Sequence, residues 1–376
     1  MFKIINKDQS TIARIGVLET RSGKIETPFF MPVATKATAK YLSSNDLQET
    51  GAKAIICNSF ILSLRPGIEV VKKFTRLADF MSFPGIVFTD SGGFQMYAES
   101  LYINSTIKGI SFRNPFSGEK IFISPEDSMK IQCSLGADVA MCLDSMPLIS
   151  ASFSEVEKAV STTTQWAKRC KSAHDKIQKN IKKERKQLLF GICQGGVHKA
   201  LRERSTKDIS KIDFDGYAIG GLALGEPREE MYRMIAESKK LLPENKPVYV
   251  MGVGHPVDVL TAISLGADIF DSRFPTKTAR HGGLLTWNGK LNILNAKYKV
   301  DSNPIDKNCG CFVCKNYSIS YIRHLLLQEE GNGYRLASFH NLHFMQSLIK
   351  KAKERIMLGD FQNFKKSLEK KYIKGR

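Results

Sequence analysis

The stretch Leu265-Gly266-Ala267-Asp268-Ile269-Phe270-Asp271 combines three signals that together decide the fold. Glycine after an apolar run supplies the left-handed residue that ends a helix. The apolar run Ala267–Phe270 predicts a short buried strand. Asp271 follows that strand directly. A carboxylate at this position lies at the open end of the fold, where the strand ends, rather than in the core. This order of helix end, strand and carboxylate is typical of proteins in which helices and parallel strands alternate.

The same order occurs a second time at Leu135-Gly136-Ala137-Asp138, which precedes the apolar run Val139–Leu143 and then Asp144. A further apolar run leads into Asp90 and the glycines after it. The carboxyl ends of parallel strands in a closed barrel converge on one face. We therefore expect Asp90, Asp144 and Asp271 to share one site, which makes an enzyme the leading interpretation.

Short apolar runs alternate with helical periodicity over the first 275 residues. Eight of them predict strands: Pro28–Val33, Ala54–Cys57, Ile86–Thr89, Val139–Leu143, Leu188–Cys193, Gly216–Ile219, Val248–Met251 and Ala267–Phe270. Eight such units predict an α/β fold of the (β/α)₈ barrel type. An open dinucleotide-binding sheet is disfavoured, because no Gly-x-Gly-x-x-Gly follows the first strand. Gln194, Gly220-Gly221 and Met251–Gly254 also fall at predicted strand ends.

The chain has 376 residues, 42% of them hydrophobic, which is enough for one large domain and a small appendage. We expect the barrel to span residues 1–275. Residues 276–376 change in character to loops, cysteines and basic helices, which we expect to pack on the barrel. No run of eighteen apolar residues is present, and residues 1–7 lack an apolar leader, so we expect a cytoplasmic protein without membrane contact.

The net charge of +19 is concentrated in two blocks. Residues 168–186 carry nine Lys or Arg against two acids, and residues 350–376 carry ten against three. Blocks of this kind favour a polyanionic partner, with nucleic acid first and an anionic membrane second. The alternative is a solvated helix face in a lysine-rich protein.

Three of the eight cysteines are clustered, at Cys309, Cys311 and Cys314. This spacing allows three thiolates to converge on one tetrahedral ion, and Zn²⁺ suits a sulfur-rich site. No cysteine follows, so the fourth ligand is a histidine, with candidates His324, His340 and His343. Four protein ligands would make the ion structural, because no coordination position is left for water. The alternative is three surface thiols without a metal.

Together these motifs resemble the queuine tRNA-ribosyltransferase (tRNA-guanine transglycosylase) family of the bacterial type. The resemblance runs over essentially the whole chain and rests on six ordered motifs: Asp90–Gln95, Gln194–Gly196, Gly220–Ala223, Met251–Gly254, Asp271 with Pro275-Thr276, and the three clustered cysteines with His340. It implies a (β/α)₈ barrel with a zinc-binding insertion. It also implies that the protein exchanges the wobble guanine of tRNAs with G-U-N anticodons for a 7-deazaguanine. The expected partners are the tRNA anticodon loop, the base and a second copy of the chain.

The resemblance assigns roles to individual residues. Asp271 becomes the nucleophile that attacks the ribose, and Asp90 the general acid and base; no organic cofactor is needed. The base-binding set is Asp90, Ser91, Gly92, Gly93, Phe94, Asp144, Gln194, Gly221, Leu222 and Met251, with Phe94 and Met251 on either side of the ring. The RNA-contact set is Gly252, Val253, Gly254, His255, Pro256, Val257, Asp258, Thr276, Lys277, Thr278, Ala279 and Arg280. The zinc ligands are Cys309, Cys311, Cys314 and His340.

Ser145-Met146 stands after Asp144, where the bacterial family commonly has Glu-Cys. This departure leaves two candidates for the incoming base, queuine and the prequeuosine base. Loss of the acid favours queuine, whereas Glu226 remains to serve the ammonium group of the prequeuosine base. Lys277 and Ser272 are conservative departures from Arg and Cys.

Two other functions compete with an active transglycosylase. A non-catalytic tRNA-binding subunit of the same family need not keep Asp90 and Asp271, and this chain keeps both. A barrel glycosidase acting on sugars is disfavoured by the cysteine cluster and the basic charge.

Overall fold

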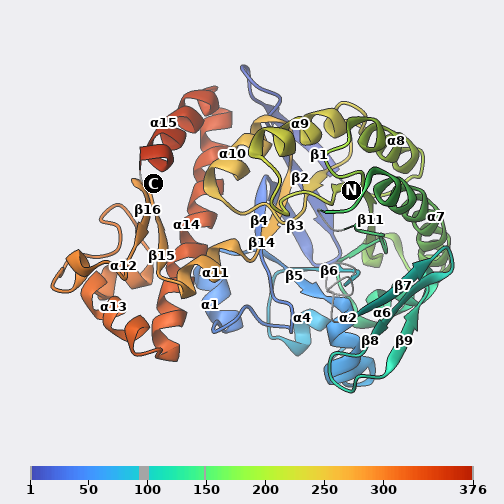
Figure 1. Ribbon diagram of the computed structural model, residues 1–376, viewed down its shortest axis with the longest axis horizontal. Coiled ribbons are helices and arrows are strands. Elements are labelled where there is room, and N and C mark those ends of the chain that lie inside the picture. The colour runs from blue at the N-terminus through green and yellow to red at the C-terminus, as the bar shows by residue number, and fades with distance from the viewer. Residues whose placement is uncertain (1, 93–100, 148–149, 375–376) are drawn as a thin grey trace.

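The computed structural model describes residues 2–92, 101–147 and 150–374. Its centre is a sheet of eight parallel strands in the order β4-β14-β13-β12-β11-β10-β6-β5 (Figure 1). These strands are β4 (Phe29–Pro32), β5 (Ala54–Asn58), β6 (Ile86–Asp90), β10 (Val139–Met141), β11 (Leu188–Cys193), β12 (Gly216–Ile219), β13 (Val248–Val250) and β14 (Ile269–Ser272). The sheet closes on itself, because Val33 pairs with Ile56 and the Ala34 N–H donates to the Ile56 carbonyl at 2.7 Å. The predicted (β/α)₈ barrel is confirmed.

Alternate residues along each strand fill the interior of the barrel. In β6, Phe88 belongs to this inner core, whereas Val87 packs outward against the helices. A strand repeats every two residues, so Asp90 continues the inward series one step beyond Phe88. In β14, Ile269 lies in the inner core and Asp271 follows it two residues later. The barrel geometry therefore directs both carboxylates toward the central axis at the mouth.

Two helices of the layer around the barrel begin and end at the residues that the sequence predicts for them. The Ser124 side chain accepts from the Asp127 N–H at the start of α6 (Pro125–Leu135), and Gly136 ends that helix at φ +69°. Gly266, at φ +83°, follows α10 (Pro256–Ser264). In the described part of the chain, the other helices of the barrel layer are α1 (Ser44–Glu49), α2 (Ser59–Leu62), α3 (Ile68–Lys72), α4 (Leu77–Phe80), α7 (Phe153–Gln178), α8 (Lys199–Ser210), α9 (Arg228–Lys239) and α11 (Phe274–Arg280).

Aspartates tie neighbouring strands together at the amino-terminal end of the barrel. Asp138, Asp215 and Asp268 each accept a hydrogen bond of 2.8–2.9 Å from a backbone N–H at the start of the adjacent strand. An antiparallel sheet that sequence analysis did not predict lies at the same end: β1 (Phe2–Lys7), β2 (Arg14–Thr20) and β3 (Gly23–Thr27). Arg14 forms an ion pair with Asp268 at 2.6 Å, with both side chains almost fully buried. The N-terminal sheet is thereby fixed to the last barrel strand.

Two further parts of the chain stand outside the barrel layer. A second unpredicted antiparallel sheet follows β6: β7 (Tyr102–Thr106), β8 (Gly109–Arg113) and β9 (Lys120–Ile123). After α11 come β15 (Gly283–Thr286), β16 (Gly289–Asn292), α12 (Phe312–Asn316), α13 (Ile319–Leu327), α14 (Gly331–Met357) and α15 (Phe361–Lys374). Helix α14 packs against the barrel, where the Gln346 side chain donates to the Phe30 carbonyl at 3.0 Å. Among the described residues, no helix has the length and apolarity needed to cross a membrane.

Candidate active site and metal centre

Asp90 ends β6 at the barrel mouth, and its environment favours the protonated form. Burial raises the pKa of Asp90 to about 7, and the nearby charges of Asp271 and Asp144 act in the same direction. The Gly92 N–H, which donates to the Asp90 carboxylate at 2.9 Å, opposes the shift. A carboxyl group with a pKa near neutrality can both give and take a proton at physiological pH.

Asp271 in β14 is held by two donors on one carboxylate oxygen. The Tyr249 hydroxyl donates to Oδ1 at 2.5 Å, and the Gly252 N–H donates to the same atom at 3.0 Å. Burial raises the pKa of Asp271, whereas the Tyr249 and Gly252 hydrogen bonds and the charge of Arg273 act against that rise. These two donors orient the carboxylate, and its Oδ2 accepts no hydrogen bond from the described residues.

Tyr249 is a site residue that sequence analysis missed. It lies in the apolar run of β13, and its ring belongs to the inner core of the barrel. A tyrosine inside a run of valines is typical of packing, so the sequence carries only one signal for a role. That signal is its position two residues before Met251, on the same inward face of the strand.

Asp144 and Gln194 meet on the other side of the mouth. The Gln194 amide donates to the Asp144 carboxylate at 2.6 Å, and the Ser91 hydroxyl lies 3.4 Å from its second oxygen. Burial raises the pKa of Asp144 to about 6, with both hydrogen bonds opposing the shift. The Gln194 Oε1 atom is buried and has no partner within the described part of the chain. Asp144 and Gln194 together present a polar edge for a ligand with its own donors and acceptors.

Gly221 allows the backbone to approach this amide closely. Its φ is +67°, and a Cβ at this position would lie 2.3 Å from the Gln194 Oε1 atom. Both observations require glycine here. Leu222 is buried, and Glu226 closes the turn that follows by accepting from the Ala223 N–H at 2.5 Å and the Leu224 N–H at 2.9 Å.

Arg202 lies behind this polar edge. Sequence analysis did not predict its role, because its neighbours in α8 are charged and this pattern is typical of a solvated helix face. The residue is fully buried. Its guanidinium donates to the carbonyls of Cys193 at 3.0 Å, Gly220 at 2.9 Å and Gly196 at 2.8 Å. Burial lowers the pKa of Arg202 to about 10. Arg202 thereby joins the loop that carries Gln194 to the loop that carries Gly221.

The two predicted RNA-contact segments lie at the rim of the mouth and are partly buried. Gly252, His255 and Val257 reach solvent, whereas Val253, Gly254, Pro256 and Asp258 are buried. In α11, Lys277, Thr278 and Arg280 reach solvent, and Thr276 and Ala279 are buried. Met251 is half-buried against the inner core. The predicted base-binding residues Gly93 and Phe94 lie outside the described residues.

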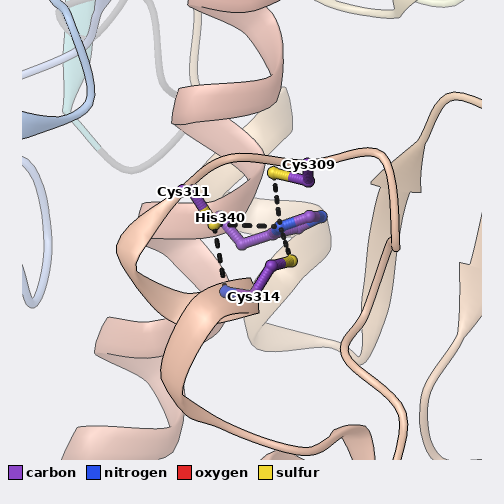
Figure 2. Close-up of side chains that lie close together, drawn as sticks. All are labelled: Cys309, Cys311, Cys314 and His340. Carbon is purple, nitrogen blue, oxygen red and sulfur yellow. Dashed lines mark hydrogen bonds between the residues drawn. The ribbon is translucent and has the colours of Figure 1, made fainter.

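Figure 2 shows the three clustered cysteines gathered around His340 of α14. The His340 Nδ1 atom lies 3.8, 3.6 and 3.4 Å from the Sγ atoms of Cys309, Cys311 and Cys314. Ligands at about 2.3 Å from a tetrahedral ion are roughly 3.7 Å apart, so these separations fit one metal ion. The other ring nitrogen, Nε2, lies 2.8 Å from the Leu285 carbonyl, which orients Nδ1 toward the sulfurs. Of the three histidine candidates, His340 completes the cluster, and His324 is exposed.

Comparison with known proteins agrees with this architecture. The chain matches the family model for Queuine tRNA-ribosyltransferase over residues 8–374. A protein of that name from Staphylococcus aureus (strain bovine RF122 / ET3-1) is 44% identical over 360 residues, which cover 96% of this chain and 93% of that protein. Its namesake from Lysinibacillus sphaericus (strain C3-41) is 44% identical over 364 residues, covering 96% and 94%. With a match that spans nearly its whole length, the chain belongs to the queuine tRNA-ribosyltransferase family.

Proposed function

We propose that this protein is a tRNA-guanine transglycosylase, which exchanges the wobble guanine of G-U-N anticodons for a 7-deazaguanine in queuosine modification. The observation that carries the proposal is the pair of unlike carboxylates at one mouth. Asp271 is held by two donors, whereas Asp90 has a pKa raised to about 7. Paired carboxyl groups with different environments are typical of retaining glycosyl transfer. The alternative, a non-catalytic tRNA-binding subunit, would have no use for this pair.

The reaction proceeds in two displacements. The wobble nucleotide leaves its stack and enters the mouth. An Asp271 oxygen bonds to the anomeric carbon of the ribose as the glycosidic bond breaks, and the bonding electron pair leaves with guanine. Protonated Asp90 gives its proton to the departing base.

In the second displacement, ionised Asp90 takes a proton from the incoming base. The nitrogen of that base then attacks the anomeric carbon, and the Asp271 oxygen leaves with its electron pair. Two inversions restore the original anomeric configuration, both carboxyl groups return to their starting states, and no energy input is required.

The polar edge formed by Asp144 and Gln194 serves base recognition. The Watson–Crick edge of guanine offers two donor groups and one carbonyl oxygen, and Asp144 accepts from the donors. Ser91, the Gln194 amide and the Gly221–Leu222 backbone complete the hydrogen bonds. Phe94 and Met251 contact the two faces of the ring, as an aromatic ring and a polarisable thioether can.

For the incoming base we favour queuine over the prequeuosine base. Ser145 and Met146 are buried beside Asp144. Because Ser145 replaces the commonly acidic residue, this position carries no charge. Both carboxylate oxygens of Glu226 already accept backbone N–H groups, which weakens its role as a partner for an ammonium group. A competition assay with both bases at equal concentration tests this choice. A clear preference for the prequeuosine base would contradict it.

The metal of the Cys309, Cys311, Cys314 and His340 cluster is proposed to be Zn²⁺, one per chain. Three thiolates and one imidazole form a donor set that zinc prefers. When bound, the ion supplies a structural crosslink. It activates no water, because the four protein ligands close its coordination shell. All of the chemistry therefore falls to the carboxylates of the mouth.

The tRNA is proposed to approach the rim through residues 252–258 and 276–280, in the cytoplasm. Exposed Lys277 and half-buried Arg280 would contact phosphates next to the wobble nucleotide. We also propose a homodimer. Its supporting observation is a group of aromatic rings near the metal cluster. Phe312 and Tyr321 are exposed and flank the half-buried Tyr317, with their ring centroids 5.8 and 5.7 Å from that of Tyr317. Sedimentation of the purified protein tests the dimer.

The experiment that tests the activity is capture of the covalent intermediate. Asp271→Ala should bind tRNA yet form no adduct that survives denaturation. Asp213→Ala is the matched control, because its side chain is 89% exposed and pairs with Lys246 near the amino-terminal end of the barrel. If the adduct persists in Asp271→Ala, the nucleophile is a different group, with Asp90 the next candidate.

A further inference from the structure

Only one of the two basic blocks of the sequence reaches the rim of the mouth. The block 168–186 covers the second half of α7 and the loop that leads into β11 (Figure 1). Because parallel strands begin at the end of the barrel opposite the mouth, this block lies away from the mouth. The end of α15, in contrast, lies against the rim of the mouth. There the Tyr372 hydroxyl donates to the Thr286 carbonyl at 3.1 Å, and its ring lies 5.5 Å from His255. Of the two blocks, the C-terminal one therefore comes near a substrate in the mouth, through the end of α15.

The C-terminal block forms the walls of a groove rather than a uniform helix face. Between α14, α15 and the metal-binding turn lies a cavity of about 580 Å³, and an adjoining hollow of about 430 Å³ shares Ser367 and Lys371 with it. We call the two together the α14–α15 groove. Its cationic lining is Lys350, Lys351, Arg355, Lys366, Lys370 and Lys371, against the single acid Glu354. Trp287 and Phe344 also line the groove, with ring centroids 5.0 Å apart.

The lysines of the groove have no carboxylate partners. Lys353 and Lys365, which do not line the groove, pair with Glu26 at 3.0 Å and Glu369 at 2.6 Å. The groove lysines 350, 351, 366, 370 and 371 have no carboxylate within 4.0 Å in the described part of the chain. Lys351 instead lies 5.3 Å above the Trp287 ring. Arg355 pairs with Asp360 at 2.7 Å, and Glu354 is the one acid of the lining, so the five lysines leave the groove with an excess of positive charge. Such an excess on a concave surface raises the local potential and favours a polyanion.

We propose that the α14–α15 groove binds a length of tRNA phosphodiester backbone outside the anticodon loop. The inference rests on the proposed function, since it takes tRNA as the substrate of the neighbouring mouth. The lysines neutralise phosphates, and Trp287 offers an aromatic surface to a ribose or base. A phosphodiester chain can enter a concave groove, whereas a bilayer surface cannot follow one. The groove is a second binding site for the tRNA, and the end of α15 connects it to the rim of the mouth.

The test compares two triple variants with equal loss of charge. Lys366→Gln/Lys370→Gln/Lys371→Gln removes cations from the groove. The control, Lys179→Gln/Lys182→Gln/Lys183→Gln, removes three exposed lysines of the other basic block, which also have no carboxylate within 4.0 Å among the described residues. The affinity of each protein for full-length tRNA is measured across a range of salt concentrations, and the same is done with a minimal anticodon stem-loop.

For the groove variant we expect at least a tenfold loss of affinity for full-length tRNA. The slope of log affinity against log salt concentration should fall in magnitude by roughly two, because two to three phosphate contacts are lost. The loss for the stem-loop should be several-fold smaller, and the control should match the parent protein. Equal losses in both triple variants would show a mere net-charge effect and overturn the proposal. Equal losses for tRNA and stem-loop would also overturn it, because the groove would then belong to the anticodon site.

Tryptophan fluorescence gives a second measurement at the groove itself. The chain has two tryptophans, and Trp166 is fully buried. We expect tRNA to change the emission of the parent protein and not that of Trp287→Phe. Binding to vesicles of phosphatidylserine and phosphatidylcholine that the groove variant loses, with tRNA affinity intact, would assign the groove to membranes and refute the proposal. Both measurements report binding alone, so they remain readable if the guanine-exchange chemistry fails.

Discussion

Replacement of Tyr249 by Phe tests whether Asp271 acts as the ionised nucleophile. The change removes one oxygen and with it the 2.5 Å hydrogen bond to Asp271 Oδ1, while the ring stays in the inner core. A hydrogen bond to a charged group contributes about 1.5–3 kcal/mol. Its loss should therefore raise the pKa of Asp271 further. The sign is upward, because the lost hydrogen bond favoured the ionised form.

The assay is single-turnover formation of the RNA adduct as a function of pH. The acidic limb of the profile, where the rate falls as Asp271 takes up a proton, should move to higher pH. Rates well above the limb should stay within a few-fold of the parent, because the carboxylate is then ionised in both proteins. An acidic limb that stays in place, or moves to lower pH, would refute the assignment of Asp271 as nucleophile.

Tyr217→Phe is the matched control for this experiment. Tyr217 is a buried tyrosine of the neighbouring strand β12, and its hydroxyl donates to the Ile212 carbonyl at 2.8 Å. That bond lies at the amino-terminal end of the barrel, away from the carboxylates of the mouth. The control loses a hydrogen bond and the same oxygen atom, so it reports the effect of truncation on folding alone. Its pH profile should coincide with that of the parent.

Three other substitutions test the remaining features. Gly221→Ala places a side chain at φ +67° and 2.3 Å from Gln194 Oε1, so kcat/KM for guanine exchange should fall at least tenfold. Asp268→Ala leaves the Arg14 charge buried without its partner and should lower the free energy of unfolding by about 3–5 kcal/mol in a urea titration. His340→Ala removes the only imidazole of the cluster, and elemental analysis should find well below one zinc per chain.

Each of these substitutions has a control in the same chain. Gly331→Ala meets no atom within 4 Å and should leave exchange unchanged. Lys7→Ala breaks the exposed pair with Glu244 and should change the unfolding free energy by less than about 1 kcal/mol. His324→Ala should retain its metal. The prediction for Gly221 is wrong if Gly221→Ala is fully active, and that for Asp268 is wrong if Asp268→Ala unfolds like the parent. The choice of His340 as ligand is wrong if His324→Ala loses the metal that His340→Ala keeps.

The barrel strands were predictable from the sequence because both faces of a parallel strand are buried, which produces continuous apolar runs. The errors lie at strand ends: β10 stops at Met141 rather than Leu143, and β14 begins at Ile269 rather than Ala267. Three antiparallel sheets were not predicted: β1–β3, β7–β9 and the two-stranded β15–β16. Strand β1 alternates exposed and half-buried residues, and β7 is mostly exposed, so neither contains an apolar run.

The carboxylates of the site were predictable for a different reason. A charged residue directly after a buried run has few structural explanations, so Asp90, Asp144 and Asp271 stood out. Their supporting residues did not stand out. Tyr249 is hidden among valines, and Arg202 among the charged residues of a surface helix, because a sequence does not reveal which face of an element is turned inward. Only the folded chain brings these two side chains to the groups that they orient.

Pairing of the first and last strands of the barrel has a consequence for folding of the protein during its synthesis on the ribosome. Arg14 and Asp268 are 254 residues apart in the chain, and β4 must pair with β14 to complete the ring. At a synthesis rate of about 5–20 residues per second, the first strand waits roughly 13–50 seconds for its last neighbour. During that time, its open edge and the growing sheet are targets for chaperones and for aggregation. Codon usage and chaperone supply over this interval should therefore affect the yield of active enzyme more strongly than changes after residue 280.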